Sequence, residues 1–121
     1  RVLLAEDNVV NQKVFQKMLR KLGVQSDVVG NGVQAIAALQ GGDYSLVLMD
    51  CQMPEIDGYE ATRLIRAGAS GQHNLKVPII AITANALDSN REACFAVGMD
   101  GYVTKPIQID ELERVVSTWL H

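Results

Sequence analysis

Short apolar runs rich in β-branched residues recur along the 121-residue chain and alternate with longer amphipathic stretches. The runs are residues 2–6, 27–29, 46–49, 79–83 and 101–104, and all are far too short to cross a bilayer. Runs that are apolar throughout are typical of strands buried on both faces of a sheet. The pattern therefore predicts five short, buried strands.

Two of the intervening stretches carry a clear helical repeat. In the last, one apolar stripe consists of Leu112, Val115, Val116, Trp119 and Leu120. In the first, the apolar face consists of Val14, Met18 and Leu22, with Phe15 and Leu19 beside it. Gly23 follows, where a helix C-cap glycine would lie. Strands that alternate with helices predict βαβ units, and hence a single doubly wound α/β domain over residues 1–121, with five parallel strands and five helices.

Composition agrees with a folded domain, because 48% of the residues are hydrophobic and 21% are charged. The formal net charge of −3 argues against direct nucleic-acid binding. Two cysteines are too few for a disulfide scaffold and indicate reduced thiols in the cytoplasm. No signal peptide is visible, since strand-like sequence begins at Val2; that abrupt start suggests a segment of a larger protein, which could itself be membrane-anchored.

Polar residues gather where the predicted strands end: Glu6 and Asp7, Asp50, Thr83, and Lys105. The carboxyl ends of the strands form the functional crevice of an open α/β sheet. Three carboxylates held together repel one another unless a cation intervenes, and oxygen ligands without His or Cys favour Mg²⁺. Lys105 would face the same anion, and Thr83 could donate a hydrogen bond to it. The set indicates a phosphoryl site with a carboxylate as candidate nucleophile.

Each of these residues also has an ordinary structural explanation. Asp50 could be a turn residue, Asp7 could stabilise the positive end of a following helix, and Lys105 could be solvated. Several such coincidences on one edge of a sheet are less expected than one, so the functional interpretation is favoured.

Four stretches resemble the receiver domain of two-component response regulators: LLAEDN (3–8), LVLMDCQMPEIDGYE (46–60), IIAITANA (79–86) and AVGMDGYVTKPI (96–107). The segments EDNVVNQ and MDCQMP are similar to the corresponding segments of receivers fused to hybrid sensor histidine kinases. The resemblance covers essentially the whole chain and implies a flavodoxin-like fold of the receiver type. It also implies a domain that catalyses its own phosphorylation and a slow dephosphorylation.

The resemblance implies a role for each residue at the strand ends. Asp50 is the phosphoacceptor, which takes a phosphoryl group from the phosphohistidine of a histidine kinase. Glu6 and Asp7 hold Mg²⁺ together with Asp50 and the backbone carbonyl of Gln52. Lys105 pairs with the phosphoryl oxygens.

Further residues matter for the switch and the surrounding loops. Thr83 moves to hydrogen-bond the phosphorylated carboxylate, and Tyr102 reorients with it. The bond between Lys105 and Pro106 is expected to be cis, as X-Pro bonds allow. Pro54 and Gly58 are expected to shape the loop after the site. Gln52 and Asn85 are expected to flank the path of attacking water, and neither is a good general base.

In the hybrid-kinase form the phosphoryl group passes on to a histidine phosphotransfer domain. Docking would use the first helix, where Asn11, Gln12 and Phe15 lie close to the site; simple core packing is the alternative for Phe15. This domain itself is expected to make no membrane contact. A weak homodimer through the last helices is a further alternative.

Other functions stay open at this point. The domain could belong to a stand-alone response regulator with a DNA-binding or other output, or it could be a degenerate receiver. A Mg²⁺-dependent phosphohydrolase with an aspartate nucleophile usually has a second Asp two residues on, where this chain has Gln52. An FMN-binding module would need a Ser, Thr or Gly phosphate loop after the first strand, where Glu6 and Asp7 stand.

Overall fold

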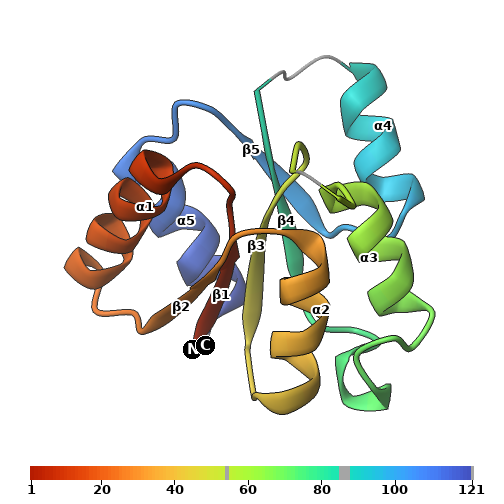
Figure 1. The fold of residues 1–121 in the computed structure, drawn as a ribbon. Helices are drawn as coiled ribbons and strands as arrows, with labels where there is room; N and C mark the ends of the chain where they lie inside the picture. Colours follow the sequence, from red (N-terminus) through yellow and green to blue (C-terminus); the bar gives the residue numbers. More distant parts are fainter. Residues whose placement is uncertain (54, 85–87, 121) are drawn as a thin grey trace.

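The computed structural model describes residues 1–53, 55–84 and 88–120, so the predictions for Pro54 and Asn85 lie outside the described residues. Five parallel strands form one sheet in the order β2-β1-β3-β4-β5 (Figure 1). The strands are β1 (Val2–Ala5), β2 (Ser26–Val29), β3 (Leu46–Asp50), β4 (Ile79–Thr83) and β5 (Gly101–Thr104). The helices are α1 (Val9–Lys21), α2 (Gly32–Gly41), α3 (Gly58–Arg66), α4 (Asp88–Ala96) and α5 (Ile109–Trp119), with a short 3-10 helix, η1 (Gln72–Asn74). The predicted doubly wound fold is confirmed.

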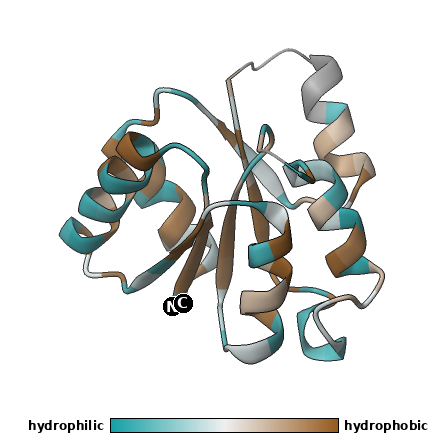
Figure 2. Cartoon of the chain, viewed as in Figure 1, coloured by the Kyte–Doolittle hydropathy of each residue, from teal (hydrophilic) through white to brown (hydrophobic). Residues whose placement is uncertain are grey.

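Helices cover both faces of the sheet: α1 and α5 lie on one face, and α2, α3 and α4 lie on the other (Figure 1). Figure 2 shows apolar strands enclosed between helices whose hydrophilic faces point outward. In β3, Leu46 and Leu48 pack with α1 and α5, whereas Val47 and Met49 pack with α2, α3 and α4. Because side chains alternate along a strand, Asp50 is directed toward the α1–α5 face.

Helix α1 is capped at both ends. The Asn8 side chain accepts a hydrogen bond from the Asn11 backbone N–H at 3.1 Å and so caps the start of the helix. At the other end Gly23 has a φ of 77°, and the Val24 N–H donates to the Leu19 carbonyl at 2.9 Å. This is the Schellman arrangement, and it confirms the C-cap glycine.

The buried face of α1 is centred on Phe15 and Leu19, which are 3% and 0% exposed. Phe15 therefore packs in the core. Val14, which the four-residue repeat groups with Met18 and Leu22, is instead 44% exposed. Each step of four residues rotates the side chain by about 40° around the helix axis, so residues two steps apart, such as Val14 and Leu22, can differ in burial.

The polar segment 68–76 packs back onto α2 through its own side chains. The Ser70 hydroxyl donates to the Ile36 carbonyl at 2.9 Å, and the Asn74 amide donates to the Leu39 carbonyl at 2.8 Å. Both polar side chains are buried. Within the described ranges, no helix combines the length and apolar character that crossing a membrane requires.

Candidate functional site

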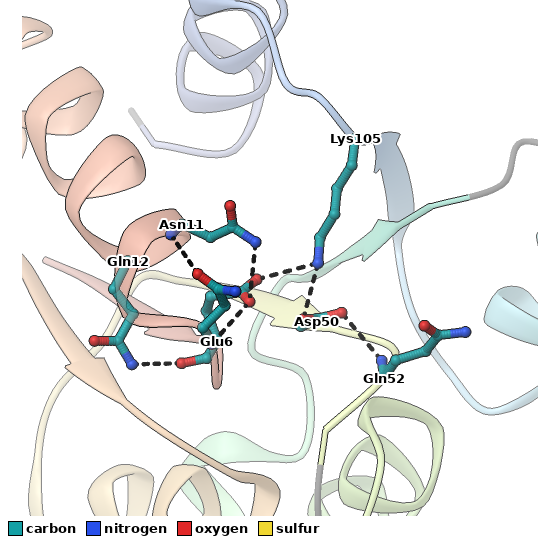
Figure 3. Close-up of polar contacts among 7 residues, drawn as sticks. Glu6, Asn11, Gln12, Asp50, Gln52 and Lys105 are labelled. Carbon is teal, nitrogen blue, oxygen red and sulfur yellow. Dashed lines mark hydrogen bonds and ion pairs between the residues drawn. The ribbon is translucent and has the colours of Figure 1, made fainter.

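The Asp50 carboxylate lies at the carboxyl end of the central strand β3 and is only 2% exposed. Its Oδ1 accepts a hydrogen bond from the Gln52 backbone N–H at 3.0 Å, and its Oδ2 lies 3.1 Å from the Lys105 Nζ (Figure 3). The rigid, fully buried strand aims this side chain at the edge of the sheet. Asp50 is thus held by one backbone donor and one ammonium group.

Glu6 and Asp7 follow β1, which pairs with β3 in the register Ala5 with Met49. This register brings the end of β1 beside Asp50. One carboxylate oxygen each from Glu6, Asp7 and Asp50 lies within 4.8 Å of the others. Glu6 is fully buried, whereas Asp7 is exposed. The structure therefore brings the three predicted carboxylates together.

Lys105 reaches this cluster from the end of β5 (Figure 3). Its Nζ lies 3.5 Å from the Glu6 Oε2, in addition to its contact with Asp50. Burial opposes the charge on Lys105, but the Asp50 and Glu6 carboxylates outweigh burial and raise the pKa of the ammonium. Burial, together with the adjoining Asp50 carboxylate, raises the pKa of Glu6, although the Asn8 N–H and Lys105 work the other way.

The donor set of this cluster fits Mg²⁺. Three carboxylates face one ammonium, so a divalent cation would balance the remaining charge. The buried Glu6 Oε2 has no hydrogen-bond partner within the part of the chain that the structure describes. Mg–O distances of about 2.1 Å place opposite ligands about 4.2 Å apart, which is close to the spread of these oxygens. Glu6, Asp7 and Asp50 are the residues that could hold the ion.

Cys51 follows Asp50 directly but belongs to the opposite side of the sheet. It packs in the core between the sheet and helices α2, α3 and α4. Burial, only partly countered by Tyr59 and reinforced by Cys94, raises the pKa of the Cys51 thiol to about 12. A thiol that stays protonated at neutral pH is a poor metal ligand, so the donors of the candidate metal site are oxygen atoms.

The loop that follows Asp50 approaches the strand very closely at Gly58, the first residue of α3. The Gly58 N–H donates to the Cys51 carbonyl at 3.2 Å. A Cβ on Gly58 would lie 2.3 Å from the Asp50 carbonyl oxygen. Only glycine permits this approach, which fixes the turn directly behind the Asp50 side chain. The Gln52 side chain is exposed beside it.

Thr83 and Tyr102 lie on the two neighbouring strands β4 and β5. Thr83 ends β4, is 5% exposed and is in register with Thr104, the residue before Lys105. Tyr102 is in register with Ala81, half-buried, and lines a groove between α4 and α5. The structure thus places Thr83 at the same sheet edge as Asp50, and Tyr102 further down β5. The peptide bond between Lys105 and Pro106 is cis.

Two residues of α1 belong to this site, although the sequence suggested only a docking role for them. The Gln12 side chain donates to the Glu6 backbone carbonyl at 2.6 Å, and the Asn11 amide donates to the Glu6 Oε1 at 3.4 Å (Figure 3). The sequence signal that could have placed them in the site was Asn8 at the start of the helix. Asn11 and Gln12 follow Asn8 by three and four positions and so lie on the same side of the helix, facing the end of β1.

Comparison with known proteins identifies the family. The response regulator receiver domain family matches residues 2–117, and the chain therefore belongs to this family. This decides among the functions left open by the sequence in favour of a receiver, and against the phosphohydrolase and FMN-binding alternatives. The chain is a receiver domain of a two-component system.

The curated relatives are larger signalling proteins. Hybrid signal transduction histidine kinase B of Dictyostelium discoideum is 42% identical over 121 aligned residues, which cover 93% of this chain and 6% of that protein. The chain spans only 6% to 16% of the length of the first curated relatives, whose names describe histidine kinases, a sensor protein and hybrid signal transduction proteins. The predicted similarity to hybrid-kinase receivers is confirmed.

Solved structures of receiver domains are also similar to this chain. The receiver domain of sensor histidine kinase PA1611 from Pseudomonas aeruginosa is 47% identical with a TM-score of 0.88; the match covers 98% of this chain and 94% of that one, which carries magnesium in its active-site cleft. The receiver domain of the Saccharomyces cerevisiae response regulator Ssk1 was crystallised with the histidine phosphotransfer protein Ypd1. That structure matches with 31% identity and a TM-score of 0.87, over 98% of this chain and 86% of the other.

Proposed function

We propose that this domain is a phosphoacceptor in a two-component phosphorelay, in which Asp50 takes a phosphoryl group from a phosphohistidine in a Mg²⁺-dependent reaction. The observation that carries the proposal is the environment of the Asp50 carboxylate. It is buried at the end of a rigid strand, contacts Lys105, and adjoins a buried Glu6 oxygen without a hydrogen-bond partner among the described residues. Buried groups left unsatisfied in this way are typical of functional sites rather than of structural ones.

In this proposal one carboxylate oxygen of Asp50 attacks the phosphorus of the phosphohistidine. The new O–P bond forms as the P–N bond breaks, the electron pair of the broken bond stays on the imidazole nitrogen, and an acyl phosphate results. Glu6, Asp7, Asp50 and the Gln52 carbonyl would hold Mg²⁺, which when bound neutralises charge on the phosphoryl oxygens. Lys105, already beside Asp50, would pair with one of those oxygens.

The same proposal makes Thr83 and Tyr102 the switch. A phosphoryl group adds roughly −1.5 to −2 charges at Asp50. Thr83, buried at the neighbouring strand end, would donate its hydroxyl to that group. Tyr102 lines the groove between α4 and α5 and would change position with it. The surface formed by α4, β5 and α5 would then report the phosphorylation state.

The proposed donor is a histidine kinase, and the proposed recipient is a histidine phosphotransfer domain, as the complex of Ypd1 with a similar receiver supports. Helix α1 offers an exposed apolar surface for docking: Val9, Val10 and Val14 are 59%, 69% and 44% exposed. Pro106 and Ile107 line a groove beside Val14. A partner that covers this surface would stand beside the Asp50 site, because the groove also includes Lys105.

Intact mass after incubation with acetyl phosphate tests the acceptor. We expect one phosphoryl group on the wild-type protein with Mg²⁺, and none with excess EDTA or in Asp50→Asn. The matched control is Asp57→Asn, because Asp57 is an exposed helix cap seven residues away and asparagine caps equally well. An adduct that persists in Asp50→Asn would disprove the assignment.

A docking test separates the partner surface from the chemistry. The double variant Val10→Lys/Val14→Lys should slow transfer to a phosphotransfer protein by about tenfold or more, as loss of an apolar interface centre does. Labelling by acetyl phosphate should be unchanged. Val33→Lys is the control, since Val33 is 49% exposed on α2, on the other face of the sheet. Equal transfer rates for the double variant and the wild type would exclude this docking surface.

A further inference from the structure

The two oxygens of the buried Glu6 carboxylate have different surroundings (Figure 3). Its Oε1 accepts hydrogen bonds from the Asn8 backbone N–H at 3.2 Å and from the Asn11 amide at 3.4 Å. Its Oε2 has no hydrogen-bond partner among the described residues and lies 3.5 Å from the Lys105 Nζ. The side chain is 0% exposed, so solvent does not satisfy Oε2. One oxygen is therefore anchored and the other is presented to the acidic cluster.

The backbone of Glu6 is fixed from the same helix. The Gln12 side chain donates to the Glu6 carbonyl at 2.6 Å, the shortest hydrogen bond around Glu6. Asn11 and Gln12 are consecutive residues in the first turns of α1 and are half-buried there. Together they hold the main chain and the side chain of the same residue. Rotation of the Glu6 side chain away from Asp50 would break the Asn11 contact, and a shift of the Glu6 main chain would break the Gln12 contact.

We propose that Asn11 and Gln12 are positioning residues, which orient Glu6 so that its Oε2 faces Asp50 and Lys105 and is available to the cation. The inference rests on the proposed Mg²⁺-dependent function of the same site. Partners of metal ligands generally set the orientation of those ligands, and their loss typically lowers metal affinity by roughly 10- to 100-fold. A buried carboxylate oxygen without a hydrogen-bond partner is costly even beside the Lys105 ammonium, so a helix that enforces this orientation favours ligand binding over the metal-free state.

A purely structural anchor between α1 and β1 would make the same hydrogen bonds. Such an anchor would matter for the stability of the metal-free protein and not for its affinity for Mg²⁺. The two roles therefore differ in a measurable quantity, namely the dissociation constant of Mg²⁺ at fixed ionic strength.

The experiment measures that constant by isothermal titration calorimetry for the wild type, Gln12→Met and Asn11→Ala. Methionine keeps the length of Gln12 without its N–H donor. Alanine at position 11 keeps the backbone N–H that Asn8 caps. The matched control is Gln16→Met, because Gln16 lies one turn further along α1 and lines a different hollow with Arg1 and Arg20. Melting temperatures of the metal-free proteins confirm that each variant is folded.

We expect Gln12→Met to weaken Mg²⁺ binding by about tenfold or more and Asn11→Ala by a smaller factor, since its hydrogen bond is longer. The phosphorylation rate that Gln12→Met loses at low Mg²⁺ should return at saturating Mg²⁺. Dissociation constants equal to that of Gln16→Met, with lower melting temperatures, would overturn the inference in favour of a structural anchor. A wild type that binds no Mg²⁺ would overturn it together with the metal site.

The outcome also separates this inference from the function on which it rests. A wild type that binds Mg²⁺ but takes no phosphoryl group would contradict the proposed function. A tenfold loss of affinity in Gln12→Met would still support the positioning role in that case.

Discussion

Charged side chains are paired differently at the two ends of the parallel strands, here called the carboxyl edge and the opposite edge of the sheet. At the carboxyl edge, Glu6, Asp7 and Asp50 crowd around Lys105, and a buried oxygen of Glu6 has no hydrogen-bond partner among the described residues. At the other edge, Arg66 donates to the Gly98 carbonyl at 2.9 Å and to the Leu75 carbonyl at 3.0 Å. The negative charges at the first edge are only partly balanced by Lys105, whereas the charges at the second edge are matched.

Asp100 completes the second network, because its Oδ2 lies 2.9 Å from Arg66 and accepts the Ile79 backbone N–H at 2.9 Å. These contacts connect the end of α3 with the segment before β4, the first residue of β4, and the segment between α4 and β5. At the carboxyl edge, by contrast, three carboxylates face one ammonium group among the described residues. The matched charges of the second network connect parts of the fold, whereas the excess of carboxylates at the carboxyl edge is what makes that edge the candidate ligand site.

The largest expected effect is at Gly58, where the carboxyl edge is also packed most tightly. A Cβ at this position would stand 2.3 Å from the Asp50 carbonyl oxygen and 3.0 Å from the Cys51 Cα, both of them backbone atoms that cannot rotate away. Gly58→Ala should lower the free energy of unfolding by about 3 kcal/mol or more. Urea denaturation followed by circular dichroism measures this. Ala61→Gly on the same helix is the control: it measures helix propensity together with the loss of one buried methyl group, since Ala61 is 0% exposed, and should cost less. An equal loss in both variants would contradict the steric argument.

The second effect concerns Mg²⁺, which should stabilise the folded protein by binding at the carboxyl edge alone. At a free concentration of 100 times its dissociation constant, a ligand that binds only the folded state adds about 2.7 kcal/mol. Thermal unfolding with and without MgCl₂ should show this gain in the wild type and in variants of the Arg66 network. Glu6→Gln should reduce it strongly. A gain of the same size in Glu6→Gln would show that the ion binds elsewhere.

The third effect tests the network of Arg66 and Asp100 at the opposite edge. Arg66→Met removes a guanidinium that bridges two carbonyls and a carboxylate, and it should cost about 2 kcal/mol after allowance for partial exposure. Mg²⁺ affinity and phosphorylation by acetyl phosphate should be unchanged, because Arg66 lies at the opposite end of the strands. Arg63→Met, on the exposed side of the same helix, should change stability by less than about 0.5 kcal/mol. A change in Mg²⁺ affinity in Arg66→Met would show that the two edges are coupled.

The carboxyl edge could be predicted from sequence because its residues follow strands. Each of Glu6, Asp50, Thr83 and Lys105 comes at or directly after a continuous apolar run, and parallel strands bring such positions to one edge. The opposite network gave no such signal. Arg66 ends a helix, and Asp100 is 34 residues away. Nothing in the periodicity of either segment indicates that the two residues meet.

The same limit applies to polar side chains that point inward. Asn11 and Gln12 read as surface residues of an amphipathic helix, but the cap at Asn8 turns them toward Glu6. Ser70 and Asn74 make the segment 68–76 look like a flexible loop, although both satisfy carbonyl groups of α2. Composition records that a side chain is polar, and only the tertiary arrangement determines whether its partner is water or backbone.

The smallest expected effect gives the sharpest comparison, because one substitution should have opposite signs at the two edges. Asp100→Asn removes the charge that Arg66 pairs with and should cost about 1 kcal/mol in unfolding free energy. Asp50→Asn relieves repulsion from Glu6 and Asp7 while Lys105 keeps its contact with Glu6. The metal-free protein should therefore gain about 1 kcal/mol, as expected where function has been kept at the expense of stability.

Urea unfolding in EDTA for both variants provides the measurement, and the sign of each change is the result that matters. Excess Mg²⁺ should then favour the wild type over Asp50→Asn and leave the penalty of Asp100→Asn unaltered. The variant Asp50→Asn thus becomes more stable than the wild type only while the cation is absent. If both substitutions destabilised the metal-free protein equally, the Asp50 and Asp100 carboxylates would be equivalent structural ion pairs. The excess negative charge at the carboxyl edge would then not destabilise the metal-free protein, contrary to the proposal.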